Sequence, residues 1–326
     1  MEAFSDKRVL TREQIRSAAC ISDDGTILNN FLALCLDADI FVKVGDAYTL
    51  YPHASGLFGP FYGERIAANR ETKQRVAQYI LDTMDFACGA GVCRGLAEVV
   101  AAHQTHPLIV DAGTSTQAVV RCLKEQLLQG AGSTGNQLQV YTVNLHSAMT
   151  LVNSPAEVFL PRGTIDHRFA ALVGEDTAND VRVSFPRTGV ALLATSTINQ
   201  EYGLTSEDDA EIPVKREIVA KLPGTTLIVV ADHTKVGHVG QGLFANLTGR
   251  HRGLRDRFEE HAYVVIDELP PGTVEPLKGH YLEALTYLIE HFHSPDAVEN
   301  RLKMIDTRGR PIAAADIPAR VEKCTG

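Results

Sequence analysis

The chain has 326 residues, of which 44% are hydrophobic and 22% are charged. These proportions are those of a folded protein with a buried core and exclude wholesale disorder, while the length predicts about two domains. With 31 basic and 40 acidic residues, the net charge is −9. A chain this acidic has no overall field that attracts nucleic acid, so DNA binding would require a local basic patch.

Composition and short motifs argue against several other classes of site. The six cysteines are scattered, which argues against a disulfide framework and predicts reduced thiols. The N-terminus lacks the apolar segment of a signal peptide, and the longest apolar runs are too short to span a bilayer. We therefore expect a soluble, cytoplasmic protein. Metal, nucleophile-elbow and nucleotide-binding motifs are absent, so we expect no metal ion and no cofactor, and interpret His233 and His238 as ordinary loop histidines.

Residues 1–53 are predicted to form a small N-terminal domain. Helical patterns occur at 11–19 and 26–38, and two short alternating strands surround a Gly-Asp turn within 40–51. Helix, turn, helix and hairpin is the order of a winged helix-turn-helix. A generic α+β cap fits the same pattern, and the sequence alone leaves both interpretations open.

The rest of the chain predicts a mostly parallel, Rossmann-like α/β domain. After a glycine-rich linker at 54–63, this domain occupies 64–274 and begins with a helix at 64–84. Short apolar runs separated by helical stretches follow at 108–111, 138–143, 157–160, 189–196, 225–232 and 262–267. Residues 275–326 are predicted to form a helical tail that docks onto its own sheet or onto a second subunit.

The clearest candidate site follows the first of these strands. Asp111 ends the strand, Gly113 allows a tight turn, and Thr114, Ser115 and Thr116 begin a helix. Glycine lets main-chain N–H groups approach a ligand, and the positive end of the helix favours phosphate or another small anion. The alternative is that the hydroxyl groups only cap the helix.

Two more strand ends carry polar residues. Asn144 follows the second strand, where it is either a helix cap or part of the same site. Asp232 and Lys235 follow a later strand and indicate either contacts to a sugar hydroxyl and a phosphate or a surface ion pair. Glu211 and Lys215 are four residues apart on a predicted helix, a spacing typical of a solvated pair.

The order and spacing of these segments resemble the DeoR family of bacterial transcriptional regulators. The resemblance covers roughly residues 64–268 and is carried by the segments 64–81, 108–123, 138–148, 157–174, 191–219, 228–237 and 262–268. It implies an N-terminal winged helix-turn-helix and a sugar-phosphate sensor domain. The sensor fold of that family is shared with ribose-5-phosphate isomerase, glucosamine-6-phosphate deaminase and the CoA transferases.

The resemblance also implies roles for individual residues. The family's phosphate loop falls on Asp111 and the four residues 113–116, and its strand-end Asn on Asn144, although Val143 replaces the preceding Thr. Its Gly-Gly pair becomes Arg162-Gly163, so that Gly163 is the matching candidate. Further candidate ligand-binding positions are Glu211, Lys215, Asp232 and Lys235, the last two within the family's Asp-x-x-Lys-x-Gly signature.

The N-terminal domain matches the family less well. Residues 1–53 contain five basic and eight acidic residues, a net charge of −3, and the segment that aligns with the recognition helix has four Asp and no Lys or Arg between Asp23 and Asp39. Such a surface disfavours phosphate contacts. The residues that would contact DNA are Arg12, Arg16, Asn29, Asn30 and Lys43.

Three hypotheses follow. The first is a DeoR-like regulator, expected to be a homo-oligomer, that senses a phosphorylated sugar or similar small anion. The second is a ligand-sensing or protein-interaction module that has lost DNA binding. The third is a sugar-phosphate isomerase or deaminase in which Asp232 or Glu211 acts as the base; the resemblance favours a sensor over an enzyme.

Overall fold

The computed structural model describes most of the chain in two compact units. The described residues are 9–18, 26, 28–29, 32, 41–44, 47–50, 65–88, 91–102, 107–129, 138–200, 203–222, 224–238, 242–245, 262–273, 277–296 and 299–319. One unit comprises Met1–Arg70 with Asp166–Ala171, and the other comprises Glu71–Ile165 with Leu172–Gly326.

The described residues of the smaller unit include a helix and a three-stranded antiparallel sheet. Its elements are β1 (Val9–Thr11), α1 (Arg12–Ala18), β2 (Phe41–Val44) and β3 (Ala47–Leu50), with strand order β1-β3-β2. The helix predicted at 11–19 and the hairpin predicted within 40–51 are both confirmed. Within 26–38 only four positions are described, so the winged helix-turn-helix stays a prediction.

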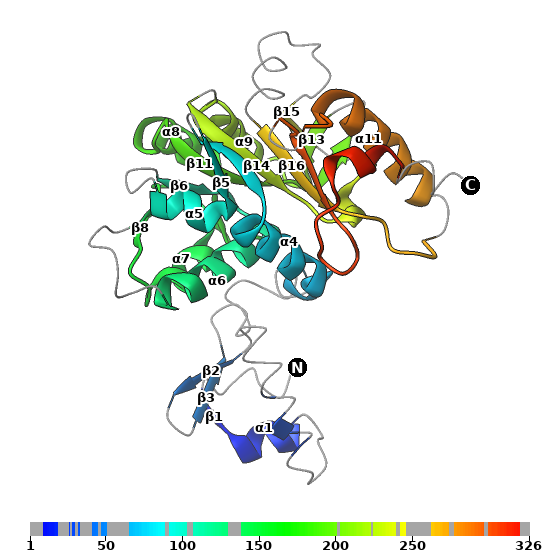
Figure 1. The fold of residues 1–326 in the computed structure, drawn as a ribbon. Helices are drawn as coiled ribbons and strands as arrows, with labels where there is room; N and C mark the ends of the chain where they lie inside the picture. Colours follow the sequence, from blue (N-terminus) through cyan, green and yellow to red (C-terminus); the bar gives the residue numbers. More distant parts are fainter. Residues whose placement is uncertain are drawn as a thin grey trace. The chain divides into compact units, whose positions relative to one another are not determined.

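A seven-stranded parallel sheet dominates the larger unit (Figure 1). Its strands, in spatial order, are β17 (Leu302–Ile305), β16 (Ala262–Asp267), β14 (Thr225–Val230), β11 (Gly189–Ala194), β6 (Leu108–Val110), β7 (Gln139–Thr142) and β8 (Glu157–Phe159). Each neighbouring pair is parallel. The six strands predicted from the apolar runs are all present, which confirms the α/β fold.

The seventh strand, β17, was not predicted. It lies beyond residue 274, in the segment expected to be a helical tail, and pairs in parallel with β16. The amphipathic helix predicted in that segment is α11 (Leu277–Phe292). Residues 302–305 are therefore part of the main sheet rather than of a separate tail.

The strand order places a topological switch point between β6 and β11. From β6 the chain adds β7 and β8 on one side, and it then returns to add β11, β14, β16 and β17 on the other. Open α/β sheets bind ligands at such a point, beyond the carboxyl ends of the strands. Asp111, Asn144 and Asp232 all follow the carboxyl end of a strand in this sheet.

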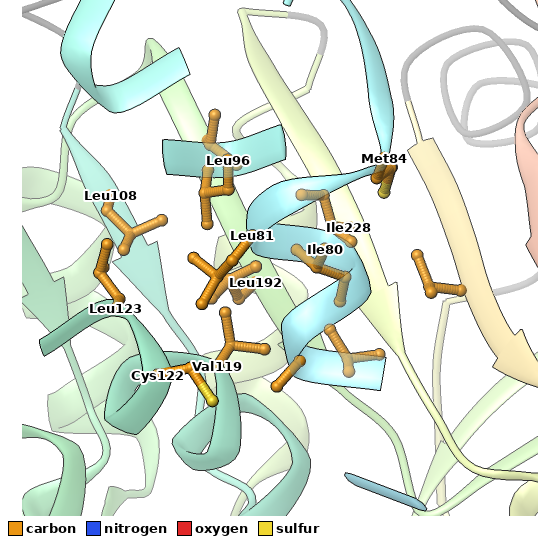
Figure 2. Close-up of a cluster of buried hydrophobic side chains, with 14 of the residues drawn as sticks. Ile80, Leu81, Met84, Leu96, Leu108, Val119, Cys122, Leu123, Leu192 and Ile228 are labelled. Carbon is orange, nitrogen blue, oxygen red and sulfur yellow. The ribbon is translucent and has the colours of Figure 1, made fainter. Parts of the chain in front are cut away.

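Side chains on both faces of the central strands are buried, so the sheet is covered on both sides. On one face, residues from three helices pack over the strands (Figure 2): Ile80 and Leu81 of α4 (Arg70–Asp82), Leu96 of α5 (Gly95–Ala102), and Val119, Cys122 and Leu123 of α6 (Thr114–Gln129), above Leu108, Leu192 and Ile228. This apolar layer fixes α6, whose first turn follows Asp111.

The structure contains further elements outside the large sheet. They are β4 (Asp85–Cys88), β5 (Gly91–Arg94), α7 (Leu145–Leu151), β9 (Thr164–Asp166), β10 (Ala171–Val173), α8 (Glu175–Ser184), β12 (Thr197–Asn199), β13 (Gly203–Ser206), α9 (Ile212–Val219), η2 (His233–Lys235), β15 (Gly242–Ala245) and η3 (Ala314–Asp316). Strands β12, β13 and β15 form a second, antiparallel sheet. Among the described helices, none has the length and apolar composition that a membrane crossing needs.

Candidate ligand site at the switch point

A buried ion pair lies between the carboxyl ends of β6 and β11. The ammonium group of Lys215, on α9, is 2.5 Å from Oδ2 of Asp111, and the side chains are 2% and 1% exposed. The same Oδ2 accepts a hydrogen bond of 3.0 Å from the main-chain N–H of Ala194, the last residue of β11. Asp111 therefore joins two strand ends and a helix.

The ammonium group of Lys215 has acceptors for all three of its hydrogens. Besides Asp111, these are the carbonyl oxygens of Ala194 at 3.0 Å and Ala112 at 3.4 Å. It also lies 5.5 Å from the ring centroid of Phe244. The solvated helix pair that the sequence suggested for Glu211 and Lys215 is wrong: both are buried, and Lys215 is 3.9 Å from Glu211 but closer to Asp111.

Burial raises the pKa of the Asp111 carboxyl to about 6, although the charge of Lys215 and its hydrogen bond oppose the rise. Nearby Glu211 adds to the rise; its own carboxylate accepts a 2.6 Å hydrogen bond from Ser206. Among the described residues, Oδ1 of Asp111 has no hydrogen-bond partner. This combination of burial and incomplete pairing marks Asp111 as a functional-site candidate.

The loop after Asp111 is held in one conformation by its own side chains. The hydroxyl of Thr116 donates to the carbonyl oxygens of Asp111 and Gly113, at 2.8 and 2.9 Å. Gly113 is required by space, because a Cβ there would lie 2.3 Å from Cβ of Ala194. Thr116 therefore shapes the loop, and its hydrogen is already donated to the main chain.

Asn144 connects this loop to the next strand end. Its side-chain NH2 donates to the carbonyl of Gly113 at 3.1 Å, and its Oδ1 accepts from the main-chain N–H of Ser147, which makes Asn144 the N-cap of α7. Asn144 is thus a helix cap, and the same side chain contacts the loop after β6. It fixes the distance between the loops after β6 and β7.

The first turn of α6 offers hydrogen-bond donors. The main-chain N–H groups of the first helical residues, Thr114, Ser115 and Thr116, have no intrahelical acceptor, and the first main-chain bond of the helix runs from Gln117 to Gly113. The hydroxyl of Ser115, which is 2% exposed, has no partner among the described residues. Unpaired N–H groups and the helix dipole together favour an anion here.

Asp232 and Lys235 lie in the turn η2, after β14. Asp232 caps this turn by accepting from the main-chain N–H and the hydroxyl of Thr234. Lys235, which is half-buried, donates to the carbonyl of Thr195 at 3.0 Å. Since Thr195 directly follows Ala194, the Lys235 ammonium lies along the same strand end as the ion pair.

These contacts lie within a region that resembles known proteins. Residues 92–252 match the DeoR C terminal sensor domain. The match covers just under half of the chain, includes all the residues discussed above and leaves out residues 1–91. This part of the chain is therefore similar to a DeoR-type sensor domain, which agrees with the resemblance found in the sequence.

Two other comparisons add no functional information. Curated proteins give no match. A solved structure of an O-methyltransferase family protein from Burkholderia thailandensis is 12% identical and covers 68% of each chain, with a TM-score of 0.19. A likeness at this level supports no statement about fold or function.

The larger unit brings most of the predicted residues together. Described contacts connect the loop 111–116 to Asn144, Lys215 and Glu211, and connect Lys235 to the end of β11. Gly163 is not among them: it lies after β8, and a Cβ there would be 1.7 Å from the hydroxyl oxygen of Thr177. Gly163 therefore allows close packing on α8.

Sequence reasoning missed a buried pair in the larger unit. His233, interpreted as an ordinary loop histidine, is anchored by Asp267: the carboxylate accepts from its main-chain N–H at 2.6 Å and contacts its Nδ1 at 2.7 Å. Contact with Asp267 raises the pKa of His233 although burial opposes the rise. Asp267 ends β16, so the rule that selected Asp111 also points to it. Among the described residues, no cluster of three or more acidic, Cys or His side chains is arranged to hold a metal ion.

Proposed function

We propose that this chain is a DeoR-like regulator whose sensor domain binds a phosphorylated sugar or a similar small anion at the switch point. The observation that carries the proposal is the first turn of α6. Its N–H groups lack intrahelical partners, and the loop before it is held by Asp111, Thr116 and Asn144. Lys235 supplies a cation at the adjacent strand end.

Calorimetric titration with a panel of sugar phosphates tests this proposal. The panel contains ribose 5-phosphate, glucose 6-phosphate and glucosamine 6-phosphate, each compared with its unphosphorylated sugar. We expect one phosphorylated member to bind and its sugar not to bind. Lys235→Ala should weaken binding about tenfold or more, because a charge-assisted hydrogen bond contributes about 1.5–3 kcal/mol.

A matched variant controls for general loss of charge. Lys124→Ala removes a lysine from α6 beyond its first turns and should leave affinity unchanged. Thr114→Ala should weaken binding if the start of the helix holds the anion. Undiminished binding in both Lys235→Ala and Thr114→Ala would exclude this location.

The second candidate function is a sensor that has lost DNA binding, and contacts in the smaller unit favour it. Arg16 pairs with Glu13 on the same helix, with its Nε 3.1 Å from Oε2, and lowers the pKa of that carboxyl. Arg12 donates to the side chain of Asn29. Two of the three basic candidates for phosphate contacts are thus engaged locally. Asn30 and the side chain of Lys43 lie outside the described residues.

A further inference from the structure

The ion pair of the sensor domain has features that separate it from a ligand contact. Asp111 and Lys215 are both almost fully buried, and the three hydrogens of the Lys215 ammonium are directed at Asp111, Ala194 and Ala112. An ammonium group has no further donor. Lys215 therefore has nothing left to donate to a phosphate in this arrangement.

Asp111 is also poorly suited to hold an anion. An ionised carboxylate only accepts hydrogen bonds, so an unshielded carboxylate beside a phosphate would repel it. Its Oδ2 is engaged by both Lys215 and the N–H of Ala194. The charge of Asp111 is thus directed into the protein, toward β11 and α9.

What the pair does hold is the main chain around the phosphate loop. Asp111 begins the loop, Lys215 binds the carbonyl of Ala112, and both contact Ala194. On the opposite side of Gly113, Asn144 binds its carbonyl. Removing one member of a buried pair leaves an uncompensated charge and strongly destabilises its surroundings.

We propose that Asp111 and Lys215 are positioning residues: they fix the main chain before α6, while the N–H groups of 114–116, the Ser115 hydroxyl and Lys235 contact the anion. This inference rests on the proposed function. It divides the residues of the proposed site into those that position the loop and those that contact the anion. In this assignment the ammonium group of Lys235, and not that of Lys215, contacts the phosphate.

The test compares Asp111→Asn, Lys215→Met and the double variant Asp111→Asn/Lys215→Met in the full chain. The probes are inorganic phosphate and ribose 5-phosphate, and both affinity and thermal stability are measured. Each single variant should melt at a lower temperature and bind at least about tenfold more weakly, the equivalent of about 1.4 kcal/mol. The double variant removes both charges, so it should recover most of the melting temperature and wild-type affinity to within about threefold.

Direct contact of Asp111 or Lys215 with the ligand would give different affinities in the double variant. If either residue touches the anion, the double variant will melt normally and still bind as weakly as the single variants. If a ligand hydroxyl reaches Oδ1 of Asp111, the double variant will keep phosphate but lose ribose 5-phosphate. Either result overturns the inference, whereas a wild-type chain that binds no member of the sugar-phosphate panel overturns the proposed function instead.

Magnetic resonance of the wild-type chain gives an answer even if the double variant does not fold. On addition of inorganic phosphate, the main-chain amide signals of Thr114, Ser115 and Thr116 and the side-chain ammonium signal of Lys235 should move. The ammonium signal of Lys215 should stay in place. A larger shift at Lys215 than at Lys235 would overturn the assignment.

Discussion

Asp111 is ionisable, yet water is excluded from its carboxyl group, so its protonation should be linked to folding. Its folded-state pKa of about 6 lies above the ordinary value of 3.8. The folded protein therefore holds a proton between these pH values that the unfolded chain has released. The charged groups that face this carboxyl are Lys215 and Glu211.

Because protonation of Asp111 is linked to folding, this carboxyl should contribute stability that is complete below about pH 4 and is lost as the pH rises through about 6. Urea unfolding across this range should show the wild type losing stability relative to Asp111→Asn/Lys215→Met. The relative slope should be at most about 1.4 kcal/mol per pH unit, the limit for one proton. A difference between the two proteins that does not vary with pH would contradict the raised pKa.

Residues of the site differ in how far the sequence predicted them. Asp111, Asn144 and Asp232 are found by their position after a strand, because a parallel sheet gathers its carboxyl ends at one edge. The partner of Lys215 was not predicted, since Asp111 lies far from it in sequence and only the strand order brings them together. The four-residue spacing to Glu211 favoured the wrong partner.

Among the elements, the turn between β6 and α6 depends on the absence of a side chain at position 113. Gly113→Ala would place a methyl group 2.3 Å from Cβ of Ala194, and overpacking of this kind costs about 1–3 kcal/mol. We expect a lower free energy of unfolding and weaker phosphate binding, measured by urea unfolding and calorimetry.

Gly272→Ala is the matched control. Gly272 has φ of +84° with no atom within 4 Å of its added Cβ, so alanine there is strained only by its backbone angle. It should destabilise the protein modestly without changing phosphate affinity. Equal losses of affinity in the two variants would argue against a special role for the Gly113 turn.

The strands show where pattern recognition succeeds. The four central strands β6, β11, β14 and β16 are mostly apolar runs, as expected when both faces are covered. β17 was missed because Lys303 interrupts its apolar run, although Lys303 is 5% exposed and its ammonium group lies 5.6 Å from the ring centroid of Tyr263. In the sequence, a buried lysine of this kind cannot be distinguished from a lysine on the surface.

For the whole molecule, the net charge of −9 limits the partners of the N-terminal unit. Non-specific DNA affinity is strongest at low salt, because it comes from phosphate contacts and the release of counterions. A gel shift assay in low-salt buffer therefore separates the two candidate functions, and no shift at micromolar protein would favour a sensor that has lost DNA binding. A specific shift that is abolished by Arg12→Ala would show that DNA binding persists.

The place of β17 at the edge of the sheet sets a limit on shortening the chain. A version that ends at residue 274, the boundary that the sequence suggested, would leave β16 as an open edge with its backbone groups unpaired. We expect that version to aggregate on expression, and a version that ends after Ala319 to stay monodisperse in size-exclusion chromatography. On this expectation, β17 keeps β16 from pairing with a second molecule.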